Sequence, residues 1–201
     1  MNILDVRNLR KQYPGFLLDD VSFTVEDGSI MGFIGRNGAG KTTTIKGILN
    51  LLHVDGGQVL FEGKDLHANE TACKERIGLV LGEFNYYKRK KLSAIAQVTR
   101  RFYADWDETL YQSLLTRFSL DTEKKISELS QGMRTKFAIA LALSHHAKLF
   151  ILDEPTSGLD PVSRDELLEI FRSIIEDGEH SILFRRTSFR TSKNARTSLR
   201  I

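Results

Sequence analysis

Hydrophobic and polar residues alternate along two stretches near the start of the chain, residues 2–9 and 17–25. This period of two is typical of half-buried β-strands, and the turn signal Asp27-Gly28 ends the second stretch. A third short strand is expected over residues 58–62, after a pair of glycines. The three segments predict an antiparallel sheet in the N-terminal part of the chain.

Continuous apolar runs predict the strands of a second, core sheet. They cover residues 30–34, 77–81, 149–152 and 182–184. Helices are expected over residues 41–51 and from Asp160-Pro161 onward, where Asp160 is a suitable N-cap and Pro161 fits the first helical position. From residue 83 to about 145 the chain lacks strand alternation and closes with a helix that is apolar nearly all round. This section predicts a small inserted helical subdomain.

A glycine-rich stretch, GRNGAGKTT, joins the first apolar run to the helix after it. It fits G-x-x-x-x-G-K-[ST], the P-loop in which backbone N–H groups and a helix N-terminus bind phosphate. Lys41 is expected to reach the β- and γ-phosphates, and Thr42 to offer its hydroxyl to Mg²⁺. The predicted nucleotide-binding residues of this loop are Gly35, Arg36, Asn37, Gly38, Ala39, Gly40, Lys41, Thr42 and Thr43. The predicted fold class is α/β: a P-loop NTPase core with an antiparallel β subdomain and a small helical subdomain.

Two adjacent acids, Asp153 and Glu154, end the apolar run over residues 149–152. Ligands of doubly wound sheets bind at the carboxyl ends of the strands, so these acids are expected near the P-loop. Asp153 is placed to hold Mg²⁺ opposite Thr42. Glu154 is the best general base for an attacking water. Glu154 and Lys41 are therefore the predicted catalytic residues.

Further motifs follow the P-loop in a fixed order. They are Leu129-Ser130-Gln131-Gly132-Met133, the Asp153-Glu154 pair and Ser157-Gly158-Leu159-Asp160. With them, residues 2–184 resemble the ATP-binding subunit of an ABC transporter. The first motif resembles the signature of that family, although Gln131 stands in place of the usual glycine and Met133 in place of the usual glutamine.

The resemblance implies several roles for residues outside the P-loop. Ser130 and Gly132 would bind the γ-phosphate of ATP held by a second protomer, and Ser130 is also a candidate N-cap for the helix after it. Tyr13 would stack on adenine, with local packing of the ring as the alternative. The family's Mg²⁺-sensing glutamine is replaced by Gly82, which leaves Glu83 as the local candidate for metal contact.

The end of the sequence departs most from the family. A histidine that contacts the γ-phosphate is expected after residues 182–184, but residues 185–201 are rich in Arg, Ser and Thr and lack periodicity, which predicts a disordered tail. We hypothesise a frameshift, because one restored base before the Arg185 codon permits Ser-Thr-His and places histidine at position 187. The coding DNA tests this hypothesis. A divergent, truncated or engineered tail is the alternative, and each version predicts ATP binding with impaired turnover.

Composition and net charge limit the classes of partner that this chain is expected to bind. The chain of 201 residues is 41% hydrophobic and 27% charged, has a single cysteine, and contains no apolar run long enough to span a membrane. The cysteine content predicts a reducing cytosol. The net charge is +3, and residues 185–201 contribute six positive charges, so residues 1–184 carry −3. A mildly acidic body does not predict nucleic-acid binding.

The resemblance thus implies a cytoplasmic ATPase, peripheral at the inner face of the cell membrane, with ATP and Mg²⁺ as cofactors. Its partners would be a transmembrane permease subunit and a second ATPase subunit, in a head-to-tail homodimer or a heterodimer. Soluble ABC ATPases of translation or DNA repair, and a nucleotide-binding module with little turnover, are the alternatives. A P-loop GTPase is disfavoured because no Asn-Lys-x-Asp motif is present.

Overall fold

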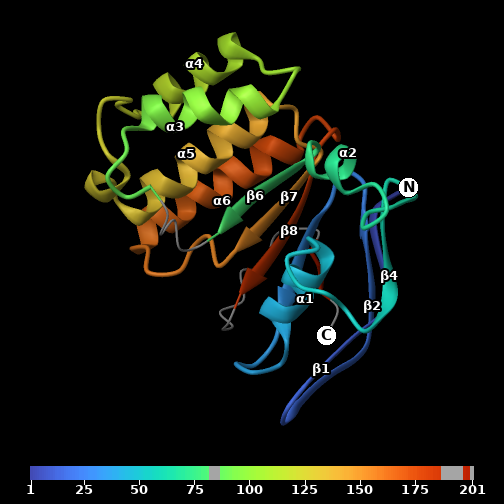
Figure 1. Ribbon diagram of the computed structural model, residues 1–201. Helices are drawn as coiled ribbons and strands as arrows, with labels where there is room; N and C mark the ends of the chain where they lie inside the picture. The colour runs from blue at the N-terminus through green and yellow to red at the C-terminus, as the bar shows by residue number, and fades with distance from the viewer. Residues whose placement is uncertain (82–86, 187–196, 200–201) are drawn as a thin grey trace.

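The computed structural model describes residues 1–81, 87–186 and 197–199. Figure 1 shows an antiparallel sheet beside a parallel sheet that carries helices. The antiparallel order is β2-β1-β4-β5, and the parallel order is β6-β7-β8-β3-β9. The strands are β1 (Asn2–Tyr13), β2 (Phe16–Glu26), β3 (Ile30–Ile34), β4 (Gly56–Phe61), β5 (Lys64–Asp65), β6 (Ile77–Leu81), β7 (Leu149–Asp153), β8 (Ser181–Arg186) and β9 (Thr197–Leu199). The α-helices are α1 (Lys41–Ile48), α2 (Glu70–Lys74), α3 (Leu92–Thr99), α4 (Glu108–Arg117), α5 (Gln131–Ser144) and α6 (Pro161–Ile175).

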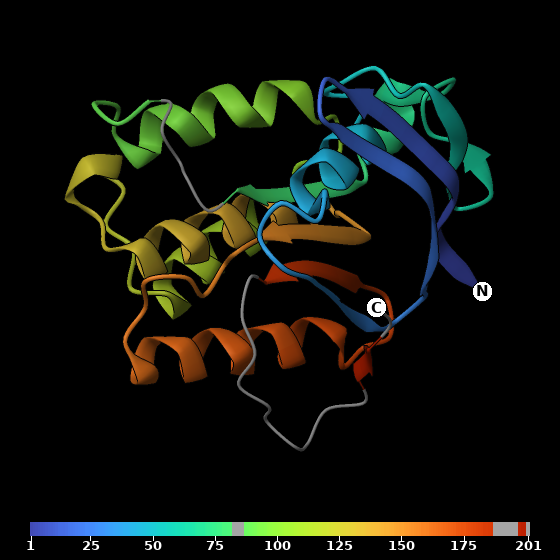
Figure 2. The same ribbon diagram turned by 90° about the horizontal axis from the view of Figure 1, so that it is seen from below.

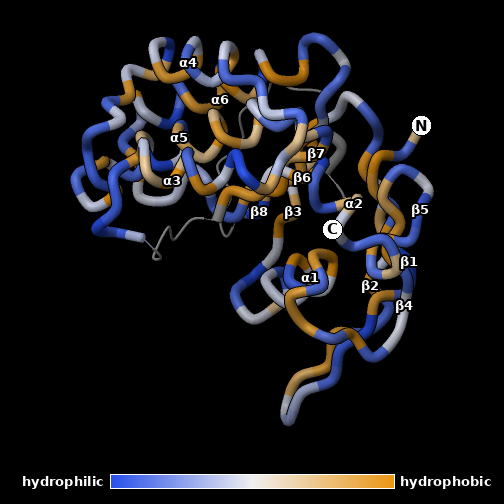
Figure 3. Tube along the Cα trace, turned by 45° about the horizontal axis from the view of Figure 1, so that its top comes forward, coloured by the Kyte–Doolittle hydropathy of each residue, from blue (hydrophilic) through white to orange (hydrophobic). Residues whose placement is uncertain are grey.

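The parallel sheet is buried on both faces. In β7, Phe150 and Leu152 belong to one apolar cluster with α5 and α6, whereas Leu149 and Ile151 belong to another with the antiparallel sheet and α1. Figure 2 shows α6 along one side of the sheet and the antiparallel strands on the other. Because both faces are covered, residues 149–152 of this strand are all apolar, and the alternation seen in β1 is absent. In Figure 3 hydrophobic colour is seen along β3, β6 and β7, as it is on parts of α1 and of the antiparallel strands.

The section predicted to be helical contains α3, α4 and α5. Leu114 and Leu115 of α4 are buried in the same cluster as Phe137 of α5. The Asp107 carboxylate caps α4 by accepting a hydrogen bond from the Leu110 N–H at 2.8 Å. Among the helices that the structure describes, none is both long enough and apolar enough to cross a bilayer.

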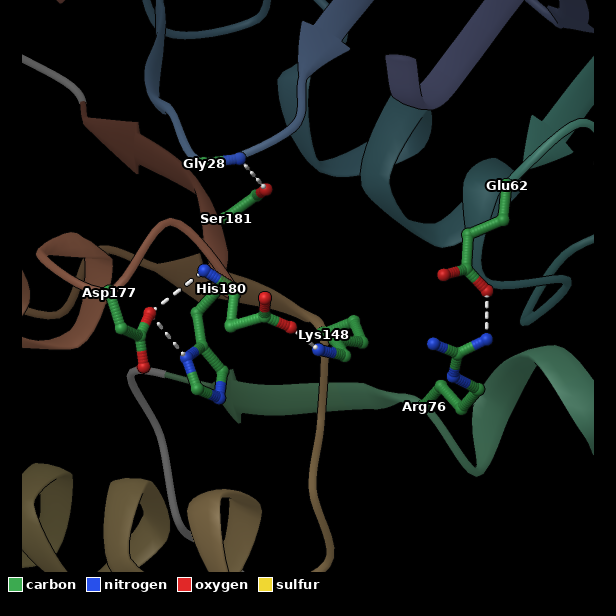
Figure 4. A network of polar contacts seen from close by, with 8 residues as sticks. Gly28, Glu62, Arg76, Lys148, Asp177, His180 and Ser181 are labelled. Atoms are coloured by element: carbon green, nitrogen blue, oxygen red, sulfur yellow. Dashed lines mark hydrogen bonds and ion pairs between the residues drawn. The ribbon is translucent and has the colours of Figure 1, made fainter. Parts of the chain in front are cut away.

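Polar contacts tie together the amino ends of the parallel strands (Figure 4). The Gly28 N–H, just before β3, donates to Ser181 Oγ of β8 at 3.0 Å. Lys148, before β7, forms an ion pair of 2.5 Å with Glu179, before β8. These contacts hold three neighbouring strands in register at one end. The opposite, carboxyl ends of the same strands are therefore placed side by side.

The tail predicted to be disordered is partly ordered. Arg185 and Arg186 complete β8, and Thr197–Leu199 form β9, which pairs parallel with β3. The prediction is wrong for Thr197–Leu199, which pair with β3 at the sheet edge, and for Arg185 and Arg186, because β8 lies between β7 and β3. Backbone hydrogen bonds to two neighbours extend the strand whatever its side-chain composition. Residues 187–196 and 200–201 lie outside the described residues.

Candidate nucleotide-binding site

The P-loop lies between β3 and α1, as the sequence predicts. Gly40 is the N-cap of α1, with φ +87°. A Cβ at this position would lie 2.6 Å from Leu18 Cδ1 and 3.0 Å from Phe16 Cζ. The left-handed backbone thus favours glycine at position 40, and any larger residue would also have to displace the side-chain ends of Leu18 and Phe16.

A cavity of about 580 Å³ opens over the start of α1. It brings several predicted loop residues together with Glu154, which comes from the end of β7. The lining residues are Phe16, Asn37, Gly38, Gly40, Lys41, Thr42, Thr43, Glu154 and Arg185. Gly35, Arg36 and Ala39 belong to the same loop but do not line the cavity. A loop of backbone N–H groups, a helix N-terminus and a lysine make this cavity suited to a polyphosphate.

Lys41 is buried, with 5% of its surface exposed. Its Nζ donates hydrogen bonds to the carbonyl oxygens of Gly35 at 2.5 Å and Arg36 at 2.7 Å. Burial lowers the pKa of Lys41, and the positive charge of Arg185 lowers it further, against the two nearby acids. An anionic ligand in the cavity would stabilise the charged ammonium that this environment disfavours.

Arg185 joins the two sides of the site. It is the register partner of Asp153 across the β7–β8 pair. Its Nε donates to Asp153 Oδ1, and its Nη1 donates to Thr42 Oγ1. Its Nη2 lies 3.3 Å from Glu154 Oε1. One guanidinium therefore contacts the P-loop hydroxyl and both acids.

Arg185 affects the pKa of Asp153 and the backbone position of Glu154. Burial raises the pKa of Asp153, while the charge and hydrogen bond of Arg185 act in the opposite direction. Glu154 has a left-handed backbone, φ +50°, and its N–H donates to the Arg185 carbonyl oxygen at 3.1 Å. Backbone and side chain of Arg185 thus both fix the end of β7.

The predicted Mg²⁺ ligands do not fit the ion in this arrangement. The Thr42 hydroxyl and the Asp153 carboxylate are the oxygen donors that Mg²⁺ prefers, but both are bonded to the Arg185 guanidinium. No group of three or more His, Cys, Asp or Glu residues within the described ranges is placed to hold a metal. Glu83, the third predicted ligand, lies outside the described residues, as do Gly82 and Thr187.

Three predicted nucleotide contacts lie away from this cavity. Ser130 caps α5 by accepting a hydrogen bond from the Met133 N–H at 3.2 Å, which confirms its predicted capping role. Gly132 is buried at the start of the same helix. Tyr13 ends β1 with 41% of its surface exposed. The roles of all three toward ATP remain predictions.

Two lining residues were not predicted. Phe16 follows the Pro14-Gly15 turn. It lies two residues before Leu18, so it continues the alternation of residues 17–25 by one position and belongs on the same face of the strand as Leu18. Arg185 was assigned to the tail by composition. Its proximity to apolar residues 182–184 was the only local sign that it continues a strand.

Comparison with known proteins agrees with this geometry. The sequence profile of the family described as "ABC transporter" matches residues 18–157. The ABC transporter ATP-binding protein YtrB of Bacillus subtilis is 32% identical over 90% of this chain. The lantibiotic transport ATP-binding protein SrtF of Streptococcus pyogenes is 31% identical over 88% of this chain and 76% of its own length.

Solved structures give the same result. A structure titled as the ATP-binding subunit of an ABC transporter has a TM-score of 0.78 and 28% identity, over 92% of this chain and 79% of that one. An ATP-binding cassette in its ADP conformation gives a TM-score of 0.76 at 26% identity, over 94% of this chain and 83% of its own. The chain belongs to the family of ABC transporter ATP-binding proteins, which are ATPases. It spans 62% of the length of YtrB.

Proposed function

We propose that this chain is an ATP-binding subunit that powers transport by a separate membrane-spanning partner. The cavity over the P-loop carries this proposal, because Lys41, Thr42 and the α1 N-terminus line one cavity whose donors suit a polyphosphate. Relatives such as YtrB and SrtF carry names that say ATP-binding and transport. The subunit would lie in the cytoplasm, at the inner face of the membrane, through its partner.

The working unit would be a head-to-tail pair of ATPase subunits, either two copies of this chain or this chain with a related one. Each ATP would lie between one P-loop and the Ser130–Gly132 segment of the other subunit. The exposed Ser130 and the α5 N-terminus behind it support this arrangement, since a capped helix start binds anions. Tyr13 would contact the adenine.

Hydrolysis would use Glu154 as the base for an attacking water, with Lys41 stabilising charge on the transferred phosphoryl group. The chain would turn over slowly as it stands, because Arg185 is bound to Asp153 and lies against Glu154. This contact also favours the second candidate, a nucleotide-binding module with little hydrolysis. ATP binding is common to both.

ATP binding through the P-loop is tested by Lys41→Ala. Loss of the ammonium should weaken ATP binding at least about tenfold, as expected for a charge-assisted contact. Lys64→Ala, an exposed lysine of β5, is the matched control and should leave the affinity unchanged. Equal ATP affinity in wild type and Lys41→Ala, measured by equilibrium dialysis, would overturn the proposed function.

A further inference from the structure

The oxygens around Arg185 form a small cage. Thr42 Oγ1 comes from α1, Asp153 Oδ1 from the end of β7, and Glu154 Oε1 from the residue after it. The Arg185 side chain is 16% exposed and the Asp153 side chain 19%. Hydroxyl and carboxylate oxygens are the ligands that hard divalent cations prefer, but here a guanidinium lies among them.

We propose that the Arg185 guanidinium takes the place of a divalent cation, so that this chain binds ATP without metal. The proposal rests on the proposed ATP-binding function and deepens it. The ligand is therefore the free nucleotide, not its metal complex.

Charge is the first reason. The carboxylates of Asp153 and Glu154 repel the negative charges of a triphosphate in the cavity unless a cation lies between the acids and the phosphates. Arg185 supplies a permanent positive charge at that point, because a guanidinium does not lose its proton in proteins. Its single charge is weaker than that of a divalent ion, but it is covalently fixed in the sheet and needs no ion from solution.

Hydrogen bonding is the second reason. A guanidinium has five N–H groups in a planar fork, so it can hold the Thr42 and Asp153 oxygens and still direct N–H groups at a phosphate. The fork lies in the wall of the same cavity as Lys41. A nucleotide on the P-loop would thus meet two fixed cations, one from α1 and one from β8.

Topology is the third reason. β8 pairs with β7 on one side and with β3 on the other. Its residue 185 is level with Asp153 and with Phe33, the next-to-last residue of β3. A long cationic side chain here can therefore reach from the acids to the P-loop without any rearrangement of the backbone.

The experiment compares ATP affinity with EDTA and with Mg²⁺, in wild type, Arg185→Ser and Arg172→Ser. Arg172 is the matched control, an arginine on α6 that pairs with Glu169 and does not line the cavity. Wild type and Arg172→Ser should bind ATP within about threefold under the two conditions. Arg185→Ser should bind at least about tenfold more weakly with EDTA than with Mg²⁺, because it has lost a charge-assisted contact.

Two results would overturn the proposal. The first is a wild type as dependent on Mg²⁺ as Arg185→Ser, which would mean that the guanidinium leaves when the metal complex arrives. The second is an Arg185→Ser variant that still needs no metal. If Arg185→Ser does not fold, Arg185→Lys serves as the second variant, because it keeps the positive charge but loses the planar fork of N–H groups. Its dependence of ATP affinity on Mg²⁺ should lie between that of wild type and that expected for Arg185→Ser. Absence of ATP binding under both conditions would instead refute the proposed function itself.

Discussion

The two sides of the nucleotide site differ in how they hold charge. On the P-loop side, a glycine-rich backbone and the N-terminus of α1 provide N–H groups, and Lys41 is the single buried cation among the residues that the structure describes there. On the strand-end side, two carboxylates and an arginine meet at the carboxyl ends of β7 and β8. The P-loop side keeps every diagnostic position of its motif, whereas the strand-end side has a cation among its acids. We infer that the P-loop side supplies the phosphate-binding groups common to the motif, whereas Arg185 on the strand-end side removes the need for metal in ATP binding and limits the rate of hydrolysis.

The largest expected effect lies on the strand-end side. If the contact with Arg185 keeps Glu154 from acting as a base, Glu154→Gln should lower the rate of ATP hydrolysis most in a variant that lacks the arginine. In the Arg185→Ser background, Glu154→Gln should lower the rate of ATP hydrolysis about a hundredfold, the usual contribution of a general base. In the wild-type chain the same change should lower the rate by a much smaller factor. Phosphate release under single-turnover conditions measures both.

Equal losses in the two backgrounds would break this part of the comparison. They would mean that Glu154 works as a base although Arg185 lies beside it. Circular dichroism spectra of the four proteins provide the folding control.

A medium effect is expected on the P-loop side, from two glycines with similar backbones. Gly38 has φ +80° and open space where a Cβ would lie, whereas Gly40 has φ +87° and a Cβ there would meet Leu18 and Phe16. In both alanine variants the left-handed backbone costs about 1–2 kcal/mol. Gly40→Ala should lose about 1 kcal/mol more in free energy of unfolding, because the ends of the Leu18 and Phe16 side chains must shift to admit its methyl group.

Urea denaturation measures the difference between these variants. Gly38→Ala is the matched control for backbone strain. Equal stability of the two variants would show that the P-loop is not packed against Leu18 and Phe16 of the antiparallel sheet.

The smallest effect lies outside the site and concerns pH. Burial lowers the pKa of His145 below its ordinary value of 6.5. Its ring stacks on Tyr103 at 3.9 Å, and its Nδ1 lies 3.1 Å from the Glu75 carbonyl oxygen. The unfolded chain binds the proton more readily, so this residue's contribution to stability is complete above pH 6.5 and is lost as the pH falls toward the folded pKa.

His145→Phe should therefore flatten the fall in melting temperature below about pH 6.5 while keeping the stacked ring. Because this variant should stay folded at lower pH, a loss of ATP binding that it still shows in acid cannot be attributed to unfolding. An unchanged pH slope in the variant would contradict the burial of a neutral imidazole at this position.

Much of the fold follows from local pattern. The runs over residues 30–34 and 77–81 are the strands β3 and β6 with the predicted bounds, because apolar runs of that length fit a sheet buried on both faces. The P-loop and the Asp153-Glu154 pair were also predictable from the sequence, since each motif is contiguous along the chain. The N-caps Ser130 and Asp160 were predictable for the same reason.

The rest of the site depends on tertiary neighbours. Arg185 contacts Thr42, 143 residues earlier, and Asp153, 32 residues earlier. No local pattern carries this information, and the polar composition after residue 184 favoured disorder. Pairing of β8 with both β7 and β3 determined the conformation of Arg185 and Arg186. Phe16 was missed similarly, because its place in the cavity depends on how the β1–β2 hairpin lies over Gly40.

The central claim is that an arginine holds the place of the metal at this site. The most direct measurement is a crystal structure of the chain with ATP grown in the presence of Mn²⁺, with anomalous scattering recorded for manganese. We expect ATP on the P-loop, the Arg185 guanidinium between Thr42 and Asp153, and no anomalous peak between those two residues. A manganese peak there, with the arginine displaced, would contradict the claim.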